Sequence, residues 1–223
     1  MEFDSFVLAA STASLGDEPR AREHADAVEF RMDLAADPLA ALDDYDGALP
    51  VVATNRAEWE GGEATDDEAR LDALQAAAEH EAVAAVDVEL QSITKGDGDR
   101  VVEHARDHDA TAIVSVHDFD GTPSLDGMRG LLASATDHGD VGKLAVQATA
   151  PVDVLDLLRA TAEFADNGAR VATMAMGEAG RHSRAVAPLY GSVVGYAPLD
   201  PDEATAPGQY DLATLRHLVD ALS

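Results

Sequence analysis

The sequence predicts an α/β protein, an eightfold β/α barrel of the TIM type. Eight short apolar runs recur along the 223 residues, and a helical or helix-length segment follows each of them. Runs of this kind are typical of buried parallel strands joined by right-handed crossovers, and eight such strands close into a barrel. No glycine-rich linker or break in composition divides the chain, so we expect residues 1–223 to form a single domain.

The expected strands are short runs dominated by valine and alanine, with few polar residues. Such composition is expected of strands that are covered by helices on one side and face the barrel interior on the other. The strands are residues 6–10, 27–32, 49–54, 83–89, 112–116, 142–147, 171–176 and 192–196.

The expected helices alternate with these strands. A long alanine-rich run predicts the third helix, and Pro151 stands in the first turn of the sixth, where its missing N–H leaves no bond unmade. The helices are residues 17–25, 38–42, 66–80, 99–108, 125–137, 151–167 and 211–222.

The chain is strongly acidic and almost free of lysine. It has 43 Asp and Glu against 15 Lys and Arg, a formal net charge of −28, and 46% hydrophobic residues. This charge argues against nucleic acid and anionic membrane as partners, and the apolar periodicity argues against disorder. An acidic, lysine-poor and alanine-rich surface indicates a folded protein from a salt-adapted source.

The sequence also restricts the location and the chemistry of the protein. The N-terminus has no basic region followed by a long apolar segment, and no apolar run is long enough to span a bilayer, so we expect a cytoplasmic protein. Because the chain has no cysteine, it has no disulfide, thiolate metal site or cysteine nucleophile.

Lys143 is one of only two lysines, and it lies inside the sixth expected strand. Burial in an apolar run disfavours a charged ammonium and favours the neutral amine, which is the nucleophile of Schiff-base chemistry. The alternative is a lysine at a strand end whose ammonium reaches solvent or a carboxylate. The scarcity of lysine, with only Lys95 elsewhere, favours the first interpretation and leaves the second open.

Polar residues collect near the carboxyl ends of the expected strands, where barrel enzymes hold their chemistry. Glu29 and Arg31 are two residues apart on the second strand and therefore share a face. Asp87 and Glu89 repeat this spacing on the fourth strand. Spacing alone supports a functional pair and a structural ion pair about equally.

Two further segments carry candidate residues. Arg56 follows the third strand, and Glu60 lies four residues later before Gly61-Gly62, a pair that suits close backbone approach to a ligand, although a solvated loop is the alternative. His117 ends the fifth strand, where a general acid or base belongs, although a lone histidine is more often structural.

The segment after the seventh strand combines glycines with Ser183 and Arg184, which suits anion binding at a helix N-terminus. Met174 and Met176 share a face and are more often core residues than the wall of a ligand site. Other motifs are weak. His104 and His108 have helical spacing for a metal, but with no clear third ligand they are interpreted as an exposed helix face.

Taken in order, these segments resemble type I 3-dehydroquinate dehydratase. Each segment alone is weak, whereas the ordered set is specific and covers nearly the whole chain. The resemblance rests on Glu29-Phe30-Arg31-Met32-Asp33, Arg56 through Gly62, Asp87-Val88-Glu89-Leu90, Ser115-Val116-His117-Asp118-Phe119, Lys143, Met176-Gly177 through Ser183-Arg184, and Ala206-Pro207-Gly208-Gln209.

The resemblance implies a hydro-lyase of the shikimate pathway of aromatic amino-acid biosynthesis, often a homodimer, that uses no metal or cofactor. It would convert 3-dehydroquinate to 3-dehydroshikimate. By this likeness Lys143 forms the Schiff base, His117 donates and accepts protons, and Glu60 orients or assists His117. The implied substrate-binding residues are Glu29, Arg31, Arg56, Arg184, Thr205 and Gln209.

The sequence departs from the family at two places. Thr205 stands where many members have serine, so its hydroxyl is kept and a methyl group is added. The first expected strand lies almost at the start of the sequence, so we expect the N-terminal hairpin that covers the barrel floor in many relatives to be missing. We expect Phe3 or Phe6 to cover part of that floor instead.

Two other functions are compatible with the residues. One is another imine-forming barrel enzyme of the class I aldolase type, although that class commonly has a glycine-rich phosphate site after the last two strands. The other is a barrel kept for binding without catalysis.

The composition predicts that stability depends on salt. On transfer from concentrated potassium chloride to low salt, the melting temperature should fall. In 1 M salt the repulsion between carboxylates is screened beyond ~3 Å, whereas in low salt it acts over longer distances. Thermal unfolding measured across a potassium chloride series tests this, and an unchanged melting temperature would contradict it.

Overall fold

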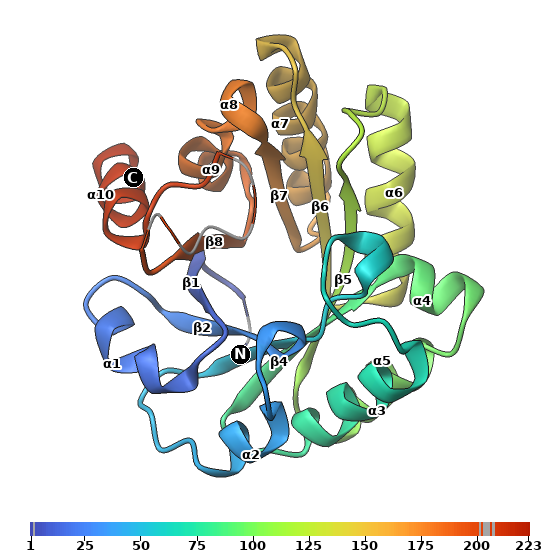
Figure 1. Ribbon diagram of the computed structural model, residues 1–223. Helices are drawn as coiled ribbons and strands as arrows, with labels where there is room; N and C mark the ends of the chain where they lie inside the picture. The colour runs from blue at the N-terminus through green and yellow to red at the C-terminus, as the bar shows by residue number, and fades with distance from the viewer. Residues whose placement is uncertain (2, 201, 203–205, 207) are drawn as a thin grey trace.

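The computed structural model describes residues 1, 3–200, 202, 206 and 208–223. It has the predicted architecture, in which parallel strands form a nearly closed barrel and the helices surround it (Figure 1). The strands are β1 Val7–Thr12, β2 Ala27–Arg31, β3 Val51–Thr54, β4 Val83–Glu89, β5 Thr111–Asp118, β6 Val141–Gln147, β7 Val171–Met176 and β8 Val194–Pro198.

The helices differ greatly in length, and four short 3-10 turns accompany them in the described part of the chain. The α-helices are α1 Glu18–Ala21, α2 Pro38–Asp43, α3 Asp67–Ala78, α4 Leu90–Lys95, α5 Asp99–Asp107, α6 Leu125–His138, α7 Pro151–Asp166, α8 Gly177–Gly180, α9 Ser183–Val186 and α10 Leu212–Leu222. The 3-10 turns are η1 Leu15–Asp17, η2 Met32–Leu34, η3 Glu58–Glu60 and η4 Ala187–Tyr190.

The strands are hydrogen-bonded in the order β7-β6-β5-β4-β3-β2-β1-β8, and the strands of each neighbouring pair in this order are parallel. The ring is completed between β7 and β8 by a single bridge. There the Val193 N–H donates to the Val171 carbonyl at 2.8 Å, and the Thr173 N–H donates to Ser192 Oγ at 3.0 Å. The Ser192 hydroxyl thus replaces part of the backbone hydrogen bonding that a continuous β7–β8 pair would have.

Several helices begin at a side chain that caps their first turn. Asp66 accepts a hydrogen bond from the Ala69 N–H at 3.0 Å, and Asp37, Ser124 and Asp211 cap α2, α6 and α10 in the same way. Such a cap satisfies one of the N–H groups that a helix start leaves without an intrahelical partner. Part of the acidic composition therefore has a local structural purpose.

The structure corrects some of the expected boundaries. The helix expected over 17–25 is confined to the 3-10 turn η1 and the four-residue α1, because the chain turns back at Ala21 and Asp26 accepts a hydrogen bond from the Leu8 N–H. The short helix α4, directly after β4, was not expected. Strand β8 lies two residues later than the expected 192–196, and β5 is longer at both ends than 112–116.

The inward-facing residues change from apolar to polar along several strands. Ala27, Ala85, Ile113 and Val141 face the interior and are followed two residues later, on the same face, by Glu29, Asp87, Ser115 and Lys143. The amino end of the barrel is therefore an apolar core, whereas polar and charged groups lie nearer the carboxyl end.

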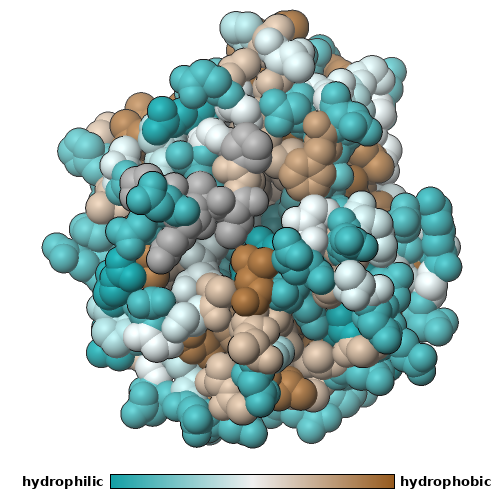
Figure 2. Space-filling model, in the orientation of Figure 1, coloured by the Kyte–Doolittle hydropathy of each residue, from teal (hydrophilic) through white to brown (hydrophobic). Residues whose placement is uncertain are grey.

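The surface is largely polar. Figure 2 shows that hydrophilic residues dominate this face of the molecule, with smaller apolar areas between them. In the part of the chain that is described, no helix has the length and apolar character needed to cross a membrane.

Phe3 closes the apolar end of the barrel. It is buried in the same cluster as Val7, Ala27 and Val141, whereas Phe6 packs outside the barrel with Leu8. Of the two aromatic residues considered for the floor, Phe3 has the required position.

Replacement of this buried ring should destabilise the barrel. We expect Phe3→Ala to lower the free energy of unfolding by about 3 kcal/mol, since it leaves a cavity in the floor. Leu222→Ala, at a residue that is 44% exposed, is the control and should change it by less than about 0.5 kcal/mol. Equal effects of the two substitutions in denaturant unfolding would exclude Phe3 from this role.

Candidate active site

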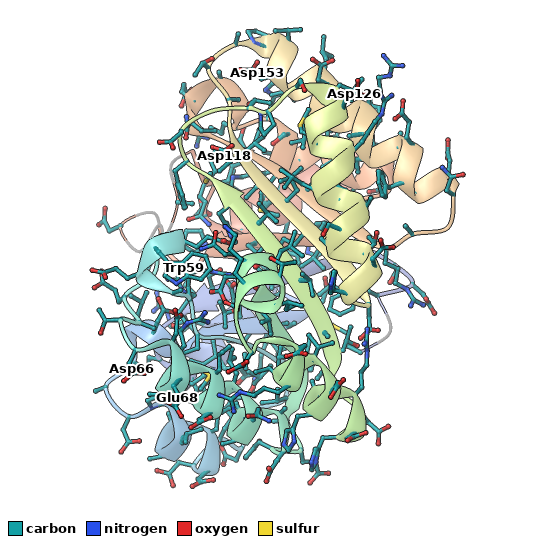
Figure 3. The ribbon with its side chains drawn as sticks, turned by 90° about the vertical axis from the view of Figure 1, so that its right-hand side faces the viewer. Trp59, Asp66, Glu68, Asp118, Asp126 and Asp153 are labelled. Atoms are coloured by element: carbon teal, nitrogen blue, oxygen red, sulfur yellow. The ribbon has the colours of Figure 1, made fainter. Side chains whose placement is uncertain are left out.

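A pocket of about 540 Å³, including its open mouth, lies at the carboxyl end of the barrel. In Figure 3, Trp59 and Asp118 lie toward the same side of the molecule. They come from the segments at the ends of β3 and β5. The pocket is lined by eight of the nine predicted site residues: Glu29, Arg31, Arg56, Glu60, His117, Lys143, Arg184 and Gln209. The ninth, Thr205, lies outside the described residues.

Lys143 projects from β6 into the barrel interior and is almost fully buried. Its Nζ donates a hydrogen bond to Asp87 Oδ2 on β4 at 2.8 Å and lies 4.2 Å from the centre of the Tyr196 ring. The surroundings are therefore not simply apolar, as the sequence alone suggested, because a buried carboxylate and an aromatic face both stabilise a cation at this position.

Asp87 is held in place by three donors. Besides Lys143, Arg56 donates to its Oδ1 at 2.6 Å, and the Ser115 hydroxyl donates to the same oxygen at 2.6 Å. Burial alone would raise the pKa of Asp87, but the charges of Arg56 and Lys143 outweigh burial and hold this pKa well below its ordinary value. Asp87 is thus a fixed negative charge beside the lysine.

His117 and Glu60 form a second coupled pair. His117 Nδ1 lies 2.8 Å from Glu60 Oε1, and both residues line the pocket. Burial raises the pKa of Glu60 to about 8 and, together with the charges of Arg56 and Lys143, lowers the pKa of His117 well below its ordinary value. At neutral pH the imidazole is therefore neutral, and the proton of the pair resides mainly on Glu60.

The loop that carries Glu60 depends on glycine. Gly61 has a φ of +82°, and a Cβ on Gly62 would lie 2.0 Å from the Arg56 carbonyl oxygen. The loop is also anchored by Glu89, which accepts a hydrogen bond from the Ala57 N–H at 3.0 Å. Tight packing of the loop on its own backbone places Glu60 beside His117.

Glu29 and Arg31 both point toward the pocket, as their spacing predicted, but they do not pair with each other in the hydrogen-bond network. Glu29 accepts hydrogen bonds from the hydroxyls of Ser11 and Thr54. Arg31 donates two parallel bonds to Asp33, at 2.8 and 2.6 Å. Each group is therefore oriented by a separate neighbour before any ligand is bound.

Arg184 enters the pocket from α9 and is buried. Its Nε has no hydrogen-bond partner among the described residues, and no ion pair to it is found there. Burial lowers the pKa of Arg184 to about 10, which leaves the guanidinium charged at neutral pH. Gln209, whose Oε1 accepts a hydrogen bond from the Ala206 N–H at 3.1 Å, lines the same pocket.

Three residues of the site were missed or left without a role by the sequence analysis. Asp87 was noticed for its spacing, but nothing local indicated that it would contact Lys143, 56 residues away. Tyr196 and Phe119 also line the pocket, and the Phe119 ring stacks on His117 with centroids 6.2 Å apart. Met174 and Met176 are both buried core residues and part of the pocket wall.

A β/α barrel whose carboxyl-end pocket holds a buried lysine beside a histidine–glutamate pair has the architecture of a barrel enzyme. The chain belongs to the type I 3-dehydroquinase family, whose model matches residues 8–223.

The comparisons also identify similar individual proteins. The chain is 58% identical to the 3-dehydroquinate dehydratase of Haloarcula marismortui, over 100% of this chain and 98% of that protein. It is 58% identical to the 3-dehydroquinate dehydratase of Halobacterium salinarum, over 98% of each. Both organisms are halophilic, which supports the salt-adapted source predicted from composition.

A solved structure shows the same barrel. The 3-dehydroquinate dehydratase of Geobacillus kaustophilus matches with a TM-score of 0.85 and 26% identity, covering 98% of this chain and 91% of that one. The predicted fold class is thereby confirmed.

The raised pKa of Glu60 predicts a specific pH dependence of stability. Between pH 6.5 and 8 the folded state retains a proton on Glu60 that the unfolded state has released, so stability falls as pH rises. His117 contributes a smaller slope of opposite sign near pH 6.5, because its imidazole is neutral in the folded state whereas the unfolded state is still partly protonated there.

Glu60→Gln should remove this loss, which we expect to be about 1.5 kcal/mol over the window. Urea unfolding at pH 6.5 and pH 8 in concentrated potassium chloride measures it. Glu58→Gln, in the same loop but exposed, is the matched control and should keep the wild-type slope. Parallel pH profiles for wild type and Glu60→Gln would contradict the assignment.

Proposed function

We propose that the protein dehydrates 3-dehydroquinate to 3-dehydroshikimate, a step of the shikimate pathway of aromatic amino-acid biosynthesis, through a Schiff base on Lys143. The observation that best supports this proposal is the buried contact of 2.8 Å between Lys143 Nζ and Asp87, beside a pocket that His117 also lines. The substrate is assigned from the family and from the names of the relatives.

Lys143 supplies the electron sink, so the proposed chemistry requires no metal or cofactor. Its amine adds to the ketone carbon to give a carbinolamine, which loses water to give an iminium ion. The ammonium must first give up a proton so that its lone pair can add, and the loss of the protonated carbinolamine hydroxyl as water restores the positive charge to the same nitrogen as an iminium ion. Asp87 is fixed beside that nitrogen. A preorganised charge of this kind stabilises the cation without reorganisation of solvent.

His117 is the proton donor and acceptor. The iminium acidifies the adjacent carbon, which loses a proton, and the hydroxyl on the next carbon leaves as water after it receives one. With the Glu60 proton on the Nδ1 side, His117 has an Nε2–H, which it donates to the carbinolamine hydroxyl as that group leaves as water, and Glu60 passes its own proton to Nδ1. Nε2 is then unprotonated, so it accepts the proton from the carbon beside the iminium and gives it to the second leaving hydroxyl. Glu60 is therefore a positioning residue that also sets the protonation state of His117.

The remaining side chains suit an anionic, polyhydroxylated substrate. The Nε of Arg184 has no hydrogen-bond partner among the described residues, so we assign Arg184 the substrate carboxylate, with Gln209 and Thr205. Glu29, Arg31 and Arg56 are assigned the hydroxyls, since each is already oriented by a neighbour.

A homodimer fits the surface beside the barrel. Val152 and Leu155 on α7, and Leu189 and Tyr190 on the adjoining turn η4, are between 44% and 65% exposed. Apolar residues grouped on neighbouring elements are typical of an interface. The sequence and its charge also predict that the protein binds neither nucleic acid nor membrane and that it is cytoplasmic. These remain predictions.

Lys143→Ala should abolish turnover, whereas His117→Ala should retain slow imine formation and lose about 10²- to 10⁴-fold in kcat. The assay follows formation of the conjugated enone from 3-dehydroquinate by ultraviolet absorbance in concentrated potassium chloride. Lys95→Ala, which removes the only other lysine from an exposed position, is the control and should retain wild-type activity.

Normal turnover by His117→Ala would refute its role as proton shuttle. Folded wild-type protein that fails to convert 3-dehydroquinate would refute the proposed function itself.

A further inference from the structure

Glu79, His104 and His108 form a cluster at the end of the barrel opposite the pocket. Glu79 follows the last residue of α3, and His108 follows the last residue of α5. These helices pack side by side (Figure 1). Because Glu79 and His108 precede β4 and β5, the cluster lies at the amino ends of those strands, away from the proposed active site.

The three side chains bring their ligand atoms together. His104 Nε2 lies 3.0 Å from Glu79 Oε1, and the rings of His104 and His108 are 4.5 Å apart. One ligand atom from each residue lies within 4.8 Å of the other two. Ligands of one zinc ion in a tetrahedron are about 3.4 Å apart, so small rotations of these partly or fully exposed side chains suffice to form a site.

The surroundings favour a cation. The carbonyl ends of α3 and α5 meet here, and each helix C-terminus carries a partial negative charge. The net charge of −28 raises the local concentration of cations further. Two imidazoles select zinc, cobalt or nickel over magnesium and calcium, which prefer oxygen ligands alone.

We propose that Glu79, His104 and His108 bind one borderline divalent cation, such as Zn²⁺, and that the ion fastens α3 to α5. The spacing of the two histidines alone gave only a possible pair of ligands, and the third comes from a different helix, 25 residues earlier. A cation bound by residues from two helices stabilises the folded chain because the unfolded chain does not hold these three groups together.

The test is equilibrium dialysis of the full chain against Zn²⁺ in concentrated potassium chloride, combined with thermal unfolding. We expect one Zn²⁺ per chain and a higher melting temperature with Zn²⁺, but no comparable shift with Mg²⁺. Loss of an outer-shell partner of a metal ligand typically lowers metal affinity by roughly 10- to 100-fold. Loss of a direct ligand should therefore lower the affinity for Zn²⁺ by at least this factor. His104→Ala, His108→Ala and Glu79→Gln should each show this loss.

His217→Ala, which removes an exposed histidine from α10, is the matched control and should bind Zn²⁺ as the wild type does. Binding that survives all three substitutions, or that Mg²⁺ reproduces, would assign the ions to scattered carboxylates and overturn the proposal. Wild-type protein that binds no Zn²⁺ in the dialysis would also overturn the proposal.

Discussion

The constraint on which the rest of the site depends is the burial of a cation, Lys143, inside the barrel. In a low-dielectric interior a cation requires a fixed countercharge, and Asp87 supplies it from a strand that is not adjacent to β6. The contact exists only in the observed register, in which Ser115 on β5 pairs with Lys143 and lies between the two strands. A shift of one residue in β6 would turn Lys143 to the outside of the barrel.

This constraint divides the molecule electrostatically. The exterior is rich in carboxylates, as the composition requires, whereas the pocket concentrates cations: Arg31, Arg56, Lys143 and Arg184 all line it. Of the carboxylates that line the pocket, Glu60 carries a raised pKa, and Glu29 accepts hydrogen bonds from the Ser11 and Thr54 hydroxyls. A negatively charged protein can therefore present a positive pocket to an anionic substrate, and concentrated salt screens the repulsion at the surface more than the buried contacts.

Much of the fold was predictable from local sequence patterns, whereas most of the residues that the structure brings together in the pocket were singled out by the resemblance to a known family. The spans of β4 and β7 were predicted to the residue, since valine and alanine runs are bounded by clear polar segments. Pairings between distant segments were not predictable. The Asp87–Lys143 contact, the third ligand at Glu79 and the replacement of a long first helix by η1 and α1 all depend on packing that no local pattern encodes.

The most direct test of a Schiff base on Lys143 is to trap the covalent intermediate. The protein is mixed with 3-dehydroquinate in concentrated potassium chloride, borohydride is added to reduce any imine to a stable amine, and the adduct is located by peptide mapping. We expect one adduct, on Lys143, and Lys95 is the only other lysine of the chain. An adduct on Lys95, or none on folded protein, would contradict the assignment of Lys143 as the nucleophile.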